Sequence, residues 1–280
     1  MQNLREIIKI MENKGSAVGH FNFAEITVLK AALKAAQELN APIILGTSEK
    51  EADFIGRKEA AALIKIYKDK GLPVFLNADH TKSLEKIKES VEAGYDSVLF
   101  DGSELSLEEN IKKTKEVVEW VKSVNPNVVV EGEIGYIGSG SKLLDEIPKG
   151  ISVTSVEDAI RFVKETGVDM LAPAVGNIHG IVKSGEPRLD IDLIKSIKEA
   201  VKIPLVLHGA SGNSNEDIKA AIEAGISIIH INTEVRVAWQ EALVNFIKAH
   251  PDEIAPYNIL SDEEEAAYKI IKDKLIIFGV

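Results

Sequence analysis

Three of the six histidines in the sequence come shortly after short apolar runs, where a strand would present side chains to a binding site. They are His80 in LNADHT, His179 in GNIHG and His208 in LVLHGASG. Neutral imidazoles that converge on one point are good Zn²⁺ ligands, and three protein ligands leave a coordination position open for substrate. Each histidine alone could be an ordinary turn residue, but together they predict a metal site.

Carboxylates occupy similar positions in the sequence. Asp79 precedes His80, Asp101 follows SVLF, and Glu131 and Glu133 lie in VVVEGEI. Side chains two apart on a strand share a face, and a carboxylate buried there needs a cation nearby. Asp101 and Glu133 could therefore supply a further ligand, a second metal position, or hydrogen bonds that orient the imidazoles. For Asp101 a helix cap or a turn is the structural alternative.

A candidate anion site follows in the segment HGASG, residues 208–212. Small residues between a strand and a helix expose backbone N–H groups, and the helix N-terminus favours negative charge. Gly209 and Ser211 would donate to the anion, and Lys183 would be either the local cation or an ordinary solvated lysine. Other residues would close the pocket around it: Gly176, Gly180, Asn232 and Thr233.

The elements that must position these residues repeat as strand followed by helix. Apolar runs predict strands at 17–23, 42–47, 73–78, 97–101, 127–134, 169–175, 204–209 and 227–232. Helical spacing predicts helices at 25–39, 57–70, 83–93, 107–123, 155–166, 190–200, 215–224 and 234–249. Eight such units favour an α/β fold with a single (β/α)8 TIM barrel, in which the carboxyl ends of the strands carry the site.

The barrel is expected over about residues 15–250 of a single domain spanning 1–280. A short helix at 3–13 precedes it, and a C-terminal helical extension from about 251 to 280 contains a helix at 262–274 as a cap or oligomer arm. The connections 135–154 and 176–189 are long enough to be lids or binding loops. Asn22, Ser48 and His230 also fall at strand ends, whereas His20 and His250 lack such neighbours and are expected to be structural or surface residues.

Composition limits the possible partners. The net charge of −11 disfavours nucleic acid and anionic membrane surfaces. The 280 residues include no cysteine, so a metal must be held by His, Asp and Glu. No apolar run approaches the length of a bilayer span. We therefore expect a cytoplasmic protein that acts on a small molecule.

In this order the motifs resemble those of the class II, metal-dependent ketose-bisphosphate aldolases, the fructose- and tagatose-bisphosphate aldolase type. The resemblance covers about residues 15–245 and lies in eight segments: GHFN (19–22), PIILGTSEKEADFIG (42–56), NADH (77–80), LFDGSELSLEENI (99–111), VEGEIGYIG (130–138), GNIHGIVKSGEPRLD (176–190), VLHGASG (206–212) and INTE (231–234). It implies reversible cleavage of a phosphorylated ketose, by default fructose 1,6-bisphosphate, to dihydroxyacetone phosphate and an aldehyde such as glyceraldehyde 3-phosphate. It also implies a role in glycolysis or carbohydrate metabolism.

The resemblance further implies roles for individual residues. One catalytic Zn²⁺ would be bound by His80, His179 and His208, with Asp101 and Glu133 as auxiliary groups for it or for a second zinc site. Asp79 would be the acid that works on the aldehyde oxygen. Substrate and phosphate would be bound by a larger set: Asn22, Ser48, Gly180, Lys183, Gly209, Ser211, His230, Asn232 and Thr233. A Na⁺ or K⁺ ion near the phosphate loops and a homodimer or homotetramer are also implied.

Two segments depart from the family pattern. The stretch GSGSK (138–142) lacks the acidic pair that the family carries on a mobile loop for proton transfer, and His230 replaces the family's asparagine. Either His230 or a loop acid, Asp145 or Glu146, takes over proton transfer, or the substrate differs. Tagatose 1,6-bisphosphate or another ketose 1-phosphate is the nearest alternative. A metal-dependent sugar-phosphate isomerase or epimerase and a non-catalytic sugar-phosphate binder are alternatives of another class.

Overall fold

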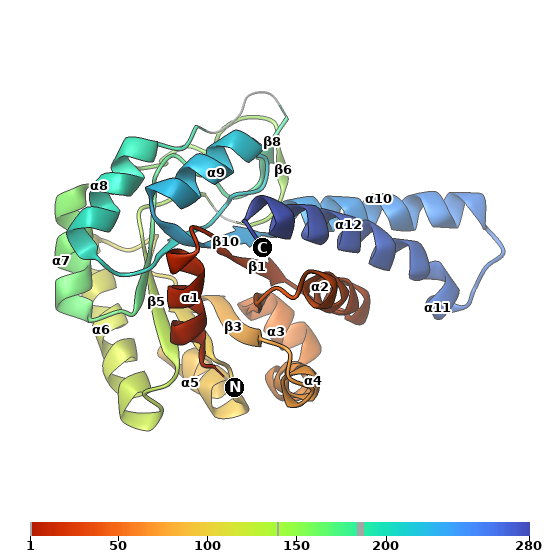
Figure 1. Ribbon diagram of the computed structural model, residues 1–280, viewed down its shortest axis with the longest axis horizontal. Coiled ribbons are helices and arrows are strands. Elements are labelled where there is room, and N and C mark those ends of the chain that lie inside the picture. The colour runs from red at the N-terminus through yellow and green to blue at the C-terminus, as the bar shows by residue number, and fades with distance from the viewer. Residues whose placement is uncertain (1, 139, 184–187) are drawn as a thin grey trace.

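Eight parallel strands close into a barrel in the computed structural model, which describes residues 2–138, 140–183 and 188–280. The order of strands around the barrel is β1-β10-β9-β7-β5-β4-β3-β2 (Figure 1). Their bounds are β1 Val18–Asn22, β2 Ile43–Ser48, β3 Val74–Thr81, β4 Ser97–Phe100, β5 Val129–Ile134, β7 Met170–Pro173, β9 Leu205–Leu207 and β10 Ile226–Ile231. The predicted TIM barrel is confirmed.

The helices around the barrel lie close to their predicted positions. They are α2 Ile26–Leu39, α4 Arg57–Asp69, α5 Leu84–Ala93, α6 Leu107–Val124, α7 Val156–Thr166, α8 Ile191–Val201, α9 Asn215–Ala224 and α10 Thr233–Ala249. The short helix α3 (Glu49–Ile55) follows β2 directly and was not predicted. At its start, Oε2 of Glu51 accepts a hydrogen bond from the backbone N–H of Ser48 at 2.7 Å.

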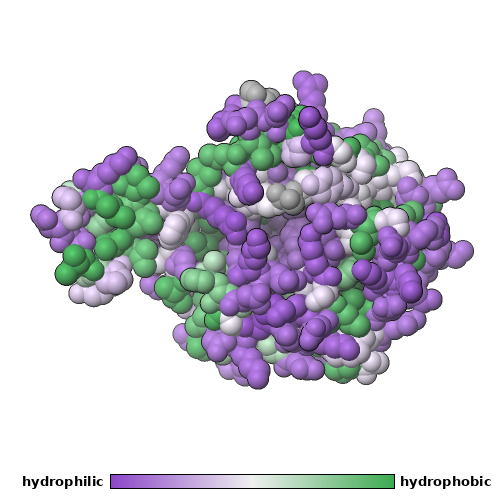
Figure 2. Space-filling model, turned by 180° about the vertical axis from the view of Figure 1, so that it is seen from behind, coloured by the Kyte–Doolittle hydropathy of each residue, from purple (hydrophilic) through white to green (hydrophobic). Residues whose placement is uncertain are grey.

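The leading helix α1 (Leu4–Asn13) closes the amino-terminal end of the barrel. Its Leu4, Ile7, Ile8 and Met11 pack with side chains from the barrel strands: Val18, Ile44, Phe75, Val129, Met170, Ala172, Val206 and Ile228. These apolar contacts fill that end of the interior. Burial of apolar surface stabilises the fold by about 25 cal/mol per Å². The opposite end is left to the polar residues that follow the strands, and Figure 2 shows a hollow bordered largely by hydrophilic residues there.

Strand β3 continues past its predicted end and is irregular where it does so. Ala78 pairs with Val98 and Thr81 with Phe100, so two residues of β3, Asp79 and His80, stand opposite one residue of β4. His80 lies in this bulge with a φ of 44°, a left-handed conformation that is costly for a side-chain-bearing residue. A regular strand would point Asp79 and His80 to opposite faces, and the bulge re-aims them.

A helical arm formed by α10, α11 (Pro256–Ile259) and α12 (Ser261–Ile277) extends from one side of the barrel (Figure 1). The base of α12 packs on α2 and buries Ala267, Ile271 and Leu275. The far end of the arm carries a hydrophobic patch (Figure 2) made of exposed side chains: Val244, Ile247, Ile254 and Tyr257. The extension expected from about 251 is thus part of a hairpin that begins in the last barrel helix. The division of the chain into barrel and extension stays a prediction.

The two long connections form a small parallel sheet of their own. Strand β6 (Leu143–Leu144) pairs with β8 (Ile181–Val182). Residues 139 and 184–187, which belong to the predicted binding loops and to GSGSK, lie outside the described residues. In the described part of the chain, no helix combines the length and apolar character needed to cross a membrane.

Candidate active site

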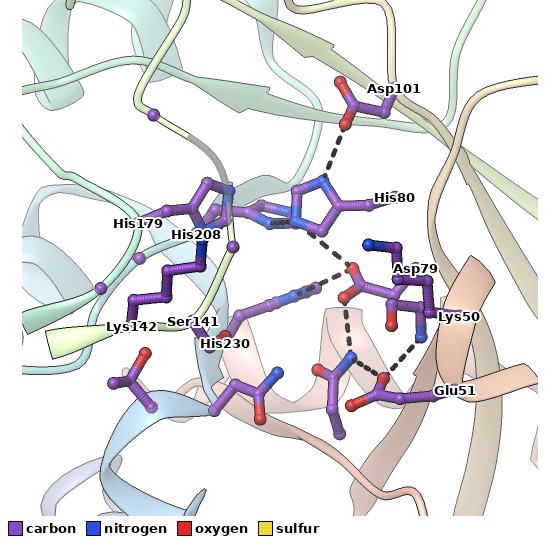
Figure 3. A pocket seen from close by; sticks show the side chains of 18 of the residues that line it. Lys50, Glu51, Asp79, His80, Asp101, Ser141, Lys142, His179, His208 and His230 are labelled. Atoms are coloured by element: carbon purple, nitrogen blue, oxygen red, sulfur yellow. Dashed lines mark hydrogen bonds and ion pairs between the residues drawn. The ribbon is translucent and has the colours of Figure 1, made fainter. Parts of the chain in front are cut away.

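A cavity of about 560 Å³ opens among the carboxyl ends of the barrel strands (Figure 3). Most of the residues predicted from the sequence line it: Asn22, Ser48, Asp79, His80, Asp101, His179, Gly180, His208, Gly209, Ser211, His230, Asn232 and Thr233. These come from many separate strand ends, so closure of the barrel brings them together. Glu133 and Lys183, which were also predicted, do not line the cavity.

The three predicted metal ligands converge. The ring centroids of His80 and His179 are 4.7 Å apart, and those of His80 and His208 are 4.8 Å apart. Nδ1 of His208 faces Nε2 of His80 at 3.1 Å. His80, His179, His208 and Glu133 each offer a ligand atom, and these four atoms lie within 4.8 Å of one another. Oε2 of Glu133 lies on the Nδ1 side of the His80 ring.

Carboxylates on the far sides of the rings set the imidazole tautomers. Nδ1 of His80 is 3.2 Å from Oδ2 of Asp101 and 3.3 Å from Oε2 of Glu133. Nε2 of His208 donates to Oε1 of Glu131 at 2.7 Å. The ring protons on those nitrogens leave Nε2 of His80 and Nδ1 of His208 as facing lone pairs, an arrangement that needs a proton or a metal cation between them. The donor set fits a divalent metal such as zinc.

The acidic surroundings favour positive charge at these rings. Burial disfavours the imidazolium of His80, but the charges of Asp79 and Glu133 outweigh burial and hold its pKa well above the ordinary value. Burial acts likewise on His208, where the hydrogen bond to Glu131 prevails and raises the pKa. Oε2 of Glu133 is buried and accepts no hydrogen bond from the described residues.

Asp79 is held from two sides and is only 3% exposed. Its Oδ2 accepts a hydrogen bond from Nδ2 of Asn22 at 2.9 Å, and its Oδ1 lies 3.5 Å from Nδ1 of His230. Oδ1 is also 3.9 Å from Nε2 of His80. Burial favours the neutral acid, but the charge of His80 and the contact with His230 hold the pKa of Asp79 well below its ordinary value. The carboxylate of Asp79 is therefore ionised at neutral pH.

His230 stacks on His20, a partner that the sequence reasoning missed. The two rings are parallel within 2°, with centroids 3.5 Å apart. The prediction that His20 lacks neighbours of this kind was wrong, although its burial agrees with a structural role. The indication was available, because His20 lies two residues before Asn22 on β1 and so shares its face. Parallel stacked rings cannot both aim an in-plane lone pair at one ion, so this pair does not fit a metal.

The predicted phosphate loops have glycines where the backbone requires them. A Cβ on Gly209, whose φ is 57°, would lie 2.2 Å from the carbonyl oxygen of Ile178. A Cβ on Gly180, whose φ is 98°, would lie 2.5 Å from the carbonyl oxygen of Lys142. Close packing of the loops explains both residues without a ligand. The same packing places Gly180, Gly209 and Ser211 together on the cavity wall.

Lys183, Asp145 and Glu146, the loop residues predicted to bind phosphate or transfer a proton, do not line the cavity. Nζ of Lys183 is paired with Asp145 at 2.7 Å, and both side chains are largely exposed. Glu146 is also exposed, and neither acid lines the cavity. Lys142 lines it instead, together with Lys50, Glu51 and Arg236, none of which was predicted. Their local sequence gives no cue, since charged residues after a strand are usually solvated.

Comparisons with known proteins agree on one family. The family model described as fructose-bisphosphate aldolase class-II matches residues 2–280. The 6-phospho-5-dehydro-2-deoxy-D-gluconate aldolase of Bacillus licheniformis is 36% identical over 99% of this chain and 94% of its own length. The sulfofructosephosphate aldolase of Alkalicoccus urumqiensis is 36% identical over 95% of this chain and 92% of its own. The crystal structure of the YdjI aldolase from Escherichia coli K12 superposes with a TM-score of 0.84 at 31% identity, covering 99% of this chain and 97% of that one.

Proposed function

Because the chain belongs to the class II fructose-bisphosphate aldolase family, we propose that it is a zinc-dependent aldolase that reversibly cleaves a phosphorylated ketose to dihydroxyacetone phosphate and an aldehyde. Fructose 1,6-bisphosphate is the default substrate, with tagatose 1,6-bisphosphate or another ketose 1-phosphate as the alternative. The observation that carries the proposal is the pair of facing nitrogens on His80 and His208, 3.1 Å apart beside Asp79. A place in glycolysis depends on the default substrate and belongs to the same proposal.

The residues of the chain divide the chemistry between them. A zinc ion held by His80, His179 and His208 would supply a Lewis acid for the ketose carbonyl. In the cleavage direction, the ionised Asp79 takes the proton of the hydroxyl whose oxygen becomes the aldehyde oxygen, and it returns that proton in condensation. Asn22 orients Asp79 through its 2.9 Å hydrogen bond.

We assign proton exchange at the carbon beside the carbonyl to His230. It lines the cavity, whereas Asp145 and Glu146 do not. Burial and the neighbouring His20 and His208 hold the pKa of His230 well below its ordinary value, so its imidazole is neutral and one ring nitrogen carries a lone pair. This assignment gives the missing loop acid a replacement within the barrel itself.

The phosphate of the ketose would lie at Gly180, Gly209, Ser211 and Thr233. Lys142 is the cation that we assign to it, because it lines the cavity and its carbonyl oxygen accepts a hydrogen bond from Ile181 beside Gly180. Lys183 could serve only by leaving Asp145. A Na⁺ or K⁺ ion near these loops is part of the proposal on the strength of the family resemblance, and rate measurements with each ion would test it.

We also propose that the protein forms a homodimer or homotetramer through its helical arm. The apolar tip residues Val244, Ile247, Ile254 and Tyr257 are exposed in the single chain, and an apolar patch of this kind is typical of an interaction surface. Light scattering on the intact protein and on Ile254→Asp tests this arrangement. A monomer at micromolar concentration would contradict it.

Metal dependence and product analysis test the function. Exhaustive chelation should abolish the cleavage of ketose 1-phosphates and 1,6-bisphosphates, and Zn²⁺ should restore it, with dihydroxyacetone phosphate identified by mass spectrometry. Activity that survives in protein shown to be metal-free would contradict the proposal. Conversion of the ketose to an isomer without any triose product would contradict it too, in favour of an isomerase or epimerase.

A further inference from the structure

Glu51 is a buried acid in the cavity wall to which the proposed function gives no role. It lies on α3, the short helix that follows β2, and its side chain is 6% exposed. Its Oε2 accepts hydrogen bonds from the backbone N–H of Ser48 at 2.7 Å and from Nδ2 of Asn22 at 2.9 Å. Its Oε1 pairs with the guanidinium of Arg236 on α10. Because both oxygens have partners on other elements, this buried carboxylate is held in one position.

The amide of Asn22 joins Glu51 to Asp79. Its nitrogen Nδ2 lies 2.9 Å from Oε2 of Glu51 and also 2.9 Å from Oδ2 of Asp79. Ionised carboxylates accept hydrogen bonds and cannot donate them, so each acid takes one of the two hydrogens on this nitrogen. Figure 3 shows Glu51 and Asp79 on the same wall of the cavity, with the bridging nitrogen between them. The two acids therefore fix the orientation of the amide together.

A glycine on β2 leaves the room that this bridge needs. Asn22 lies on β1 and Asp79 on β3, with β2 between them in the barrel. Asn22 is in register with Gly46 of β2. A Cβ at Gly46 would lie 2.2 Å from Cε1 of His20 and 3.4 Å from Oδ1 of Asn22. Because Gly46 has no side chain, the residues of β1 can reach across β2 to β3.

The hydrogen bond from Asn22 is the main restraint on the Asp79 carboxylate. Among the described residues, Oδ1 of Asp79 has no hydrogen-bond partner, and Oδ2 accepts only the bond from Asn22. The nearest ring nitrogens to Oδ1 are Nδ1 of His230 at 3.5 Å and Nε2 of His80 at 3.9 Å. With Oδ2 tied to the amide, Oδ1 is therefore the oxygen that stays on the side of the histidines.

We propose that Glu51 is a positioning residue for the proton transfer assigned to Asp79, and that it acts through the amide of Asn22. This inference rests on the proposed function, which gives Asp79 its task. While Glu51 is charged, the amide is held from both sides and Asp79 keeps one orientation. Without that charge only Asp79 itself orients the amide, so the two side chains can move together out of the geometry that proton transfer needs. Arg236 contributes by holding Glu51.

Steady-state kinetics of ketose cleavage by the zinc-loaded protein test the proposal. Glu51→Gln should lower kcat about tenfold or more while KM changes little, because a charged acceptor that orients Asp79 indirectly is lost. Asp53→Asn is the matched control. It removes an acid from the same helix that pairs with Arg57 at 2.7 Å and does not line the cavity, so kcat should be unchanged. A fall in kcat for Glu51→Gln no larger than that of the control would overturn the proposal.

A double-mutant cycle shows whether Glu51 acts through Asn22. In an Asn22→Ala background, Glu51→Gln should change kcat by less than about twofold, because the connecting amide is gone. A tenfold loss that persists in that background would overturn the proposal, since Glu51 would then act by another route. If Glu51→Gln does not fold, Arg236→Gln takes its place in the cycle, because the Arg236 side chain is 47% exposed. The same two outcomes then decide.

The NMR signal of the Asn22 amide separates this proposal from the proposed function. In nitrogen–proton correlation spectra, the side-chain pair that disappears in Asn22→Ala belongs to Asn22. In Glu51→Gln this pair should shift upfield and exchange faster with solvent, because one of its two hydrogen bonds is lost. If that change occurs in a protein without aldolase activity, the contact stands and the proposed function falls. If the pair is unchanged in Glu51→Gln of an active enzyme, the positioning role of Glu51 is wrong.

Discussion

Glu131→Gln should weaken metal binding while leaving the barrel folded. Oε1 of Glu131 accepts the Nε2 proton of His208 at 2.7 Å, and the two side chains are 0% and 1% exposed. That contact fixes the tautomer that leaves Nδ1 of His208 available to the metal, and glutamine keeps the shape but loses the charge. Hydrogen-bond partners behind a metal ligand typically contribute a factor of 10 to 100 in metal affinity, or about 1.4 to 2.8 kcal/mol. Because solvent does not screen this pair, we expect the upper half of that range.

The assay is competition for Zn²⁺ between the protein and a chromogenic chelator at fixed pH. Circular dichroism and thermal unfolding of the metal-free variant check that the fold is intact. Glu12→Gln is the matched control, because it removes a carboxylate paired with Lys198, away from the metal-site histidines. If the Kd for zinc in Glu131→Gln matches that of the control, then the assigned tautomer of His208 is wrong.

Three further outcomes follow from the site. Asp79→Asn should lower kcat about 10²- to 10⁴-fold, while the zinc content measured by mass spectrometry stays unchanged. If the variant loses its zinc, the assignment of Asp79 to proton transfer is contradicted. Lys142→Gln should raise KM for a ketose 1-phosphate about tenfold while Lys183→Gln changes it little, and the reverse result would restore Lys183 as the phosphate cation. Burial lowers the pKa of His20 from 6.5 to about 4, so between these values the unfolded chain binds a proton that the folded protein does not. The contribution of His20 to stability is therefore complete above pH 6.5 and falls by up to about 3 kcal/mol as the pH drops to 4. Urea titrations between pH 6.5 and 4 should show a smaller fall in the free energy of unfolding for His20→Gln than for the unsubstituted protein. An equal fall in both proteins would contradict the lowered pKa of His20.

The sequence by itself determined the architecture and most of the cavity lining. Short apolar runs alternate with segments of helical period, and these local patterns fix eight strand ends in order. A strand end such as that of β9 can be located without any long-range information, which is why His208 was placed correctly. The same reasoning found His80, His179 and Asp79, because each lies at the end of a predicted strand or in the loop after it.

Only the tertiary structure decided how these residues face one another. Whether Asp79 and His80 both reach the cavity depends on the bulge in β3, which is defined by pairing with β4. The stacking of His20 on His230 depends on the register between the first and last strands of the barrel. Lys142 and Lys50 gain their places from loop packing and strand register.

The features that only the tertiary structure shows have one physical cause. Side-chain period is a property of each segment and can be read locally. Direction, register and ion pairing arise between segments far apart in the chain, and the closed barrel fixes them all together.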